Sequence, residues 1–291
     1  MAKSMRTAEY FAEDEYRDYL IYRALAASEP VPEFRKILES LAASEQEHYR
    51  FWREISAKKD FRVHPFQIWL YRVMRRVLGL TFTVKFLELH VKEVVRGYRY
   101  FIETADPSVR PKLLELIDHG EHHETELISH IKEAKVAFIS SIILGLNDGL
   151  IELSGALVGF SFALRQPKLV ALVGLITGIA ATLSMAASAY MQARQEPGKD
   201  ARKSAVYTGI SYLVVVLILV LPYFLFAVPV AMTVMLVAVL SIIFLVSFYI
   251  SVLFERKFSR QFGEMFIFSA GVATISFVIA LVFRSLSGIQ I

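Results

Sequence analysis

The sequence predicts an all-α protein, with a four-helix bundle over residues 1–134 and a five-span transmembrane helical domain over residues 135–291. Two patterns predict this division. Carboxylates recur at helical spacing in the first part. Apolar stretches of bilayer-crossing length follow one another in the second part. All seven histidines precede residue 135, so a polar domain comes before an apolar one.

The first part contains a near-repeat of acidic residues. In each half a Glu is followed seven positions later by a Tyr, and then by a Glu-x-x pair that ends in His or Glu. The residues are Glu15, Tyr22, Glu45 and His48 in the first half, and Glu93, Tyr100, Glu121 and Glu124 in the second. Because positions three apart share a helix face, Glu45 and His48 can bind the same ion. The repeat therefore predicts two similar helical hairpins that together supply metal ligands.

The ligand pattern matches one known arrangement closely. Di-metal four-helix bundles take one Glu from each of two helices and a Glu-x-x-His pair from each of the other two. This chain departs from it in having Glu124 in place of His, and the extra carboxylate suits a hard cation such as iron or manganese. His122 and His123 point to either side of the ligand face, so at most they can hydrogen-bond to the metal ligands without binding the metal themselves. A chance pattern on solvated helix faces is the competing interpretation, and the repeat argues against it.

On these residues, the segment from about 5 to 134 resembles the ferritin-like superfamily, and rubrerythrin-type domains in particular. In that family such residues bridge and cap two iron ions that react with oxygen or peroxide. The resemblance implies a diiron-type site. Its ligands here would be Glu15, Glu45, His48, Glu93, Glu121 and Glu124.

Five apolar stretches reach the roughly 20 residues that a helix needs to cross a bilayer. They lie near residues 137–164, 168–193, 205–226, 229–253 and 264–285. The first residues lack the apolar core of a signal peptide, so we expect the first domain in the cytosol and the C-terminus outside. Basic loops near 194–203 and 256–260 would then obey the positive-inside rule. The absence of cysteine excludes disulfides and thiolate sites, and the charge of +4 forms no stripe for nucleic acid.

Residues 66–79 join the two hairpins and are too short and too basic to span a membrane. Trp69 and Tyr71 with three arginines have the composition of a helix that lies in the membrane interface. A connecting helix packed on the bundle is an equally good interpretation. Farther along, residues 131–138 contain neither Gly nor Pro, so the fourth bundle helix is expected to continue into the first span.

Asp148 and Glu152 lie one turn apart on one face of the first span, with Asp148 near the bilayer midplane. An ionised carboxylate there is costly unless it faces a cavity or a partner. Apart from Lys168 and Arg284, which lie at the ends of two spans, no Lys, Arg or His lies inside a predicted span to neutralise it. The charge can then be neutralised by a proton, by a metal cation, or by the two in alternation. A proton-coupled cation carrier requires such an alternation. The competing interpretation is a protonated acid in a helix contact, bonded to Ser or Tyr.

The sequence around these acids, 143–152, together with 174–178 and 184–190 in the second span, resembles the vacuolar iron transporter family. The resemblance implies that Asp148, Glu152 and Met185 line a metal pathway at a two-fold dimer interface. It further implies proton-driven export of ferrous iron or manganese from the cytosol.

Two features depart from that family. Its long acidic hairpin between the second and third spans is replaced by the short segment 195–203, and Ala189 stands where the family has an acidic residue. The first domain would then have taken over metal collection. The combination of the two domains resembles the membrane-bound ferritins, which are associated with iron efflux.

We therefore expect a homodimeric, proton-coupled Fe2+ transporter in a cell or vacuolar membrane, with metal captured, and in one version oxidised, by the first domain. Two alternatives remain: a membrane-anchored ferroxidase or peroxide reductase, and a manganese exporter. Asp148 and Glu152 discriminate against the first, because a mere anchor has no reason to keep charge in lipid. Gly155 with Gly159 and Gly174 with Gly178 form two small-residue pairs that permit close helix packing.

Overall fold

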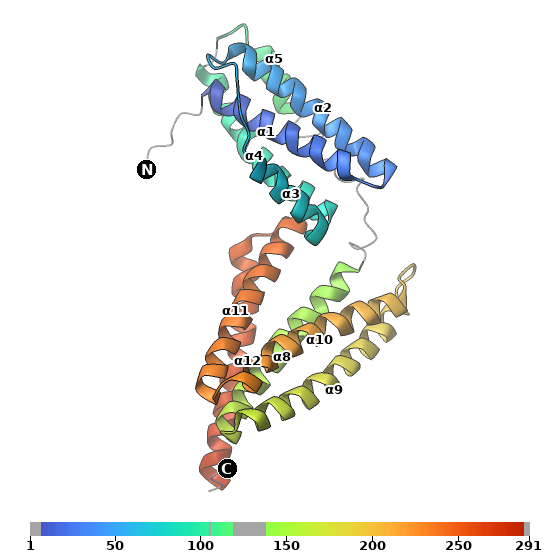
Figure 1. The fold of residues 1–291 in the computed structure, drawn as a ribbon, viewed down its shortest axis with the longest axis vertical. Helices are drawn as coiled ribbons and strands as arrows, with labels where there is room; N and C mark the ends of the chain where they lie inside the picture. Colours follow the sequence, from blue (N-terminus) through green and yellow to red (C-terminus); the bar gives the residue numbers. More distant parts are fainter. Residues whose placement is uncertain (1–6, 105, 119–137, 288–291) are drawn as a thin grey trace. The chain divides into compact units, whose positions relative to one another are not determined.

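The computed structural model describes residues 7–104, 106–118 and 138–287 (Figure 1). Every regular element within these ranges is an α-helix, and the chain divides into two compact units, residues 1–133 and 134–291. The predicted all-helical class is confirmed. The fourth helix of the predicted bundle would fall mostly on residues outside the described ranges, so the four-helix arrangement stays a prediction.

The first unit begins with a hairpin of two long helices, α1 (Ala8–Ser28) and α2 (Pro32–Ile55), drawn in blue in Figure 1. The Thr7 hydroxyl accepts a hydrogen bond from the backbone N–H of Tyr10 and so caps α1. Pro32 occupies the first turn of α2, where its missing N–H is not needed. The short connection between the helices makes them antiparallel neighbours.

Two buried layers hold this hairpin against α4 (Leu80–Thr104). The aliphatic layer includes Leu25 of α1, Leu41 of α2 and Val84 of α4. The aromatic layer contains Phe11 of α1, Trp52 of α2 and Tyr98 of α4, with ring centroids 4.6–4.8 Å apart. The short helix α5 (Arg110–Asp118) packs on the aromatic layer. Both layers are buried, and side chains that lie between them are therefore shielded from solvent as well.

α3 (Pro65–Leu78) is held on the first unit by one of its faces. Ile68 and Tyr71 pack against the aliphatic layer. The guanidinium of Arg75 donates to the Glu29 carboxylate at 2.6 and 2.9 Å. Gly79 separates α3 from α4 with φ 93°, a backbone conformation that glycine adopts without strain.

The second unit consists of five long apolar helices. They are α8 (Ile139–Leu164), α9 (Pro167–Ala193), α10 (Ala201–Leu225), α11 (Val228–Leu253) and α12 (Phe258–Ser287). Each is long and apolar enough to cross a membrane, so the prediction of five apolar helices of membrane-spanning length is confirmed. The predicted passage of the bundle into the first span falls on residues 131–137, outside the described ranges, and α8 itself begins at Ile139.

α8 lies against each of the other four helices of the second unit. Glycine makes these contacts close: a methyl group on Gly178 of α9 would lie 2.5 Å from Val216 of α10, and one on Gly155 of α8 would lie 2.6 Å from Val272 of α12. Both predicted small-residue pairs thus serve packing within this unit. They give no support of their own to a dimer.

Candidate functional site

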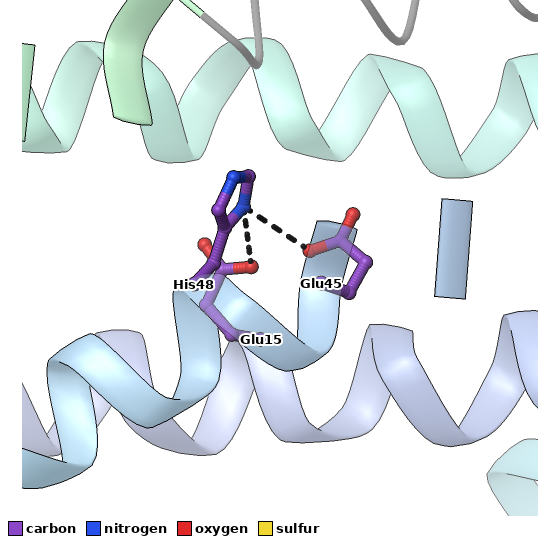
Figure 2. A group of neighbouring side chains, drawn as sticks. All are labelled: Glu15, Glu45 and His48. Carbon is purple, nitrogen blue, oxygen red and sulfur yellow. Dashed lines mark ion pairs between the residues drawn. The ribbon is translucent and has the colours of Figure 1, made fainter. Parts of the chain in front are cut away.

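Glu15, Glu45 and His48 converge in the interior of the first unit (Figure 2). Nδ1 of His48 lies 3.4 Å from Oε2 of Glu15 and 3.6 Å from Oε2 of Glu45. All three side chains are buried, and their ligand atoms lie within 4.8 Å of one another. The structure therefore brings together the three ligands predicted from the first half of the repeat.

The position of this group follows from the helical period. Glu15 lies one turn after Phe11 on α1, and His48 lies one turn before Trp52 on α2, so both adjoin the aromatic layer. Glu45 lies one turn after Leu41, which belongs to the aliphatic layer. The polar group is thus enclosed between two apolar layers, and the core that stabilises the unit also excludes water from the site.

Tyr98 is a site residue that the sequence analysis missed. Its hydroxyl on α4 donates a hydrogen bond to Oε1 of Glu15. The repeat had singled out Tyr100, which is 57% exposed. A helix turns by about 100° per residue, so two positions separate a buried side chain from a solvated one. The pattern of buried apolar residues on α4, with Val94 and Val95 one turn before Tyr98, was the available signal.

Glu45 lies in an environment that disfavours its negative charge. Burial, and then the neighbouring Glu15 carboxylate, raise the pKa of Glu45 well above its usual value. Its Oε1 atom has no hydrogen-bond partner among the described residues. A buried carboxylate oxygen without a donor is stabilised by either a proton or a cation.

The donor set fits one divalent cation. Two atoms bound to one ion at about 2.1 Å, and about 90–109° apart, are separated by about 3.0–3.4 Å. Of the two distances from His48 Nδ1, 3.4 Å lies at the upper end of that range and 3.6 Å lies just above it. Two carboxylates and one imidazole suit iron, manganese and zinc alike. The geometry therefore supports a metal site without choosing the metal.

The remaining predicted ligands lie beyond what the structure describes. Glu93 is on α4, but its side chain is outside the described part, and Glu121 and Glu124 fall in the range 119–137. The second half of the site therefore stays a prediction.

A charged network that adjoins Glu15 on α1 was not foreseen from the sequence. Asp14 accepts from Arg17 at 2.6 Å and lies 2.9 Å from Nε2 of His90 on α4. Arg17 also pairs with Asp18 at 2.9 Å. Burial, opposed by the charge of Arg17, raises the pKa of Asp18 to about 6. The bond to Asp14 raises the pKa of His90. This network ties α1 to α4 beside the candidate metal site.

In the second unit, both predicted acids lie on α8, and one of them, Glu152, has a hydrogen-bond partner. The hydroxyl of buried Tyr212 on α10 donates to Oε2 of Glu152 at 2.8 Å. Asp148 is half-buried one turn earlier, whereas Glu152 is exposed at the surface of the unit. Tyr212 belongs to a different span, so sequence spacing could not reveal it.

Two further residues complete the surroundings of these acids. Met185 on α9 is half-buried and packs against the apolar core of the second unit. Asn147 precedes Asp148 on α8, and its amide oxygen is buried without a hydrogen-bond partner among the described residues. Ala189, where the resembled family carries an acid, is buried.

A sequence model of the VIT family matches residues 139–200, which covers α8, α9 and the loop that follows. These residues form a VIT family domain. Asp148, Glu152 and Met185 all lie within it. The VIT family match, with five membrane-length helices, indicates a multi-pass membrane transporter of metal ions. No curated protein and no solved structure matches the chain.

Proposed function

We propose that the chain is a proton-coupled transporter that exports a divalent metal ion from the cytosol, with iron(II) as the main substrate and manganese(II) as the alternative. The observation that carries the proposal is a pair of carboxylates, Asp148 and Glu152, one turn apart inside the VIT family match. Neither carboxylate is paired with a basic residue in the described ion pairs of the second unit. Each can therefore exchange a proton for a cation.

The exposure of Glu152 supports a homodimer. A carboxylate at the surface of a membrane unit would face lipid, where charge is strongly disfavoured. The hydrogen bond from Tyr212 engages one carboxylate oxygen, Oε2, and a cation would bind the other. A second copy of the chain placed against this face would enclose the acids in a shared pathway.

The first unit captures the metal in this proposal. Glu15, Glu45 and His48 supply a buried site for a divalent ion, and Glu93, Glu121 and Glu124 would extend it. The loop between α9 and α10 is short, so the membrane unit has no long acidic hairpin of its own. We place the first unit and the basic loops in the cytosol, in accord with the positive-inside rule.

Metal flux into proteoliposomes tests the pathway. Asp148→Asn and Glu152→Gln keep side-chain size but remove charge, so both should insert normally and stop transport. Glu264→Gln is the matched control, because Glu264 is an exposed carboxylate of α12 paired with Arg260 at 2.8 Å. Wild-type flux in Asp148→Asn would overturn the proposal.

Deletion of residues 1–130 tests the capture role. Capture raises the metal concentration near Asp148, so the deletion should increase the half-saturating metal concentration and leave the maximal rate intact. A collapsed maximal rate would show instead that the first unit is an obligatory gate. An unchanged rate at every concentration would show that the first unit performs separate chemistry.

The second candidate function is a membrane-anchored ferroxidase or peroxide reductase. The contact of Tyr98 with Glu15 favours this candidate, since it places a phenol beside a candidate metal ligand. Metal-dependent oxygen or peroxide consumption that persists in Asp148→Asn, in a parent protein that moves no more metal than empty vesicles do, would establish it.

A further inference from the structure

α3 carries a second apolar face that the fold of the first unit does not use. Its exposed residues are Phe66 at 57%, Trp69 at 55%, Leu70 at 40% and Val77 at 72%. At 100° per residue these four positions fall within about one third of the helix circumference. Phe66 and Trp69 stack on each other with centroids 5.5 Å apart.

The opposite face is already engaged. Ile68 and Tyr71 pack on the aliphatic layer, and Arg75 binds Glu29. The helix is therefore fixed in one orientation, with its second apolar face turned outward. Elsewhere in the described part of the first unit, large exposed apolar side chains such as Val31, Tyr100 and Leu114 are scattered, as is ordinary for protein surfaces.

We propose that this outer face of α3, residues Phe66, Trp69, Leu70 and Val77, docks the first unit on an anionic lipid surface. The idea goes beyond metal transport and does not depend on it. Aromatic and aliphatic side chains on one side of a basic helix are the features of a helix lying in the membrane interface. Trp in particular favours the headgroup level.

Charge selects lipid over a protein partner. Residues 61–87 contain no Asp or Glu, and their basic residues are Arg62, Arg72, Arg75, Arg76 and Lys85. Arg72 and Arg76 are exposed and lie along one edge of the apolar face. Each arginine near an anionic membrane surface strengthens membrane binding by about fivefold.

The chain also keeps a bilayer within reach. The first unit, residues 1–133, is followed directly in the chain by the apolar second unit, residues 134–291. A weak surface can therefore dock, because covalent linkage to the membrane unit gives it a high effective concentration near the bilayer.

The test uses the full chain in vesicles. The sequence has no cysteine, so Val77→Cys can carry a single environment-sensitive fluorophore. Tyr100→Cys, on α4 and 57% exposed, is the matched control. In phosphatidylcholine/phosphatidylglycerol vesicles with brominated acyl chains, we expect strong quenching at position 77 and little at position 100. Equal quenching at the two positions would overturn the proposal.

Further variants separate the apolar from the charged contribution to docking. A second measurement distinguishes lipid from a second copy of the chain. Trp69→Ser with Leu70→Ser should abolish quenching at position 77 without changing the helical content, since both side chains are exposed. Arg72→Gln with Arg76→Gln should weaken docking roughly 25-fold on anionic vesicles, at about fivefold per arginine, and little on neutral ones. A blue-shifted label that bromolipids do not quench would contradict lipid docking. Energy transfer between labelled copies would then identify a second chain as the occupant.

Discussion

Glu45→Gln isolates the charge of the candidate metal site. Glu45 is 2% exposed, its pKa is raised by burial and by Glu15, and its Oε1 is unpaired among the described residues. Glutamine keeps the size of the side chain and can donate an amide N–H to the Glu15 carboxylate. In metal-free protein we expect stabilisation of the first unit at neutral pH by about 1–3 kcal/mol, the usual cost of an unsatisfied buried group.

With metal present, we expect Glu45→Gln to lose most of the stabilisation that bound metal gives the parent. A ligand at about 1,000 times its Kd adds about 4 kcal/mol to the stability of the folded state. A neutral amide is a weaker ligand than a carboxylate for a hard cation, so most of this gain should disappear. Each kcal/mol corresponds to a change in melting temperature on the order of 4 °C. The melting temperature of metal-free Glu45→Gln should therefore exceed that of the metal-free parent by several degrees. The metal-induced increase, about 16 °C in the parent at this conversion, should be much smaller in Glu45→Gln.

Thermal unfolding of the full chain in detergent, with and without Mn(II), provides the measurement. Tryptophan emission reports on the first unit because both tryptophans of the chain, Trp52 in the aromatic layer and Trp69 on α3, belong to it. Glu47→Gln is the control, since Glu47 is exposed on the same helix two residues away. Because a proton bound to Glu45 must leave before metal binds, the parent's metal-induced shift should grow with pH. A Glu45→Gln protein that melts like Glu47→Gln would refute the reasoning.

Two further predictions concern stability. Gly145→Ala should destabilise the membrane unit by about 1–3 kcal/mol in a detergent melt, because a methyl group there collides with the backbone oxygen of Thr208, whereas Gly271→Ala has open space and should be neutral. The raised pKa of Asp18, about 6 against an ordinary 3.8, means that the folded state holds its proton more tightly than the unfolded chain. Its contribution to stability is therefore present below about pH 4 and falls away by about pH 6, by up to about 3 kcal/mol. Asp18→Asn should flatten that slope in melts recorded across this pH range, and an unchanged slope would contradict it.

Part of the candidate ligand group was predictable because Glu45 and His48 share local helical spacing. Glu45 and His48 lie three apart on α2, and the helix period alone places them side by side. Glu15 comes from α1, and its arrival at the same point depends on the short hairpin turn. The five spans were predictable for a comparable reason, since a continuous apolar stretch of sufficient length has few other stable environments.

Tyr98 and Tyr212 were not predictable in this way. Each donates to a carboxylate on a different helix, 83 residues away for Glu15 and 60 for Glu152. Such contacts depend on how two helices rotate against each other, and that rotation is set by the packing of the aromatic layer and of the glycine contacts. Sequence periodicity fixes which side chains share a face but does not say which face meets which neighbour.

The sequence by itself determined the helical class, the division into a polar and an apolar part, and the shared helix face of Glu45 and His48. These follow from composition and from the 3.6-residue period. Only the tertiary structure decided that Glu45 is buried beside Glu15, that Tyr212 binds Glu152, and that α3 presents one apolar face inward and another outward. The physical reason is that burial and partner choice arise from contacts between helices, which a linear pattern does not contain.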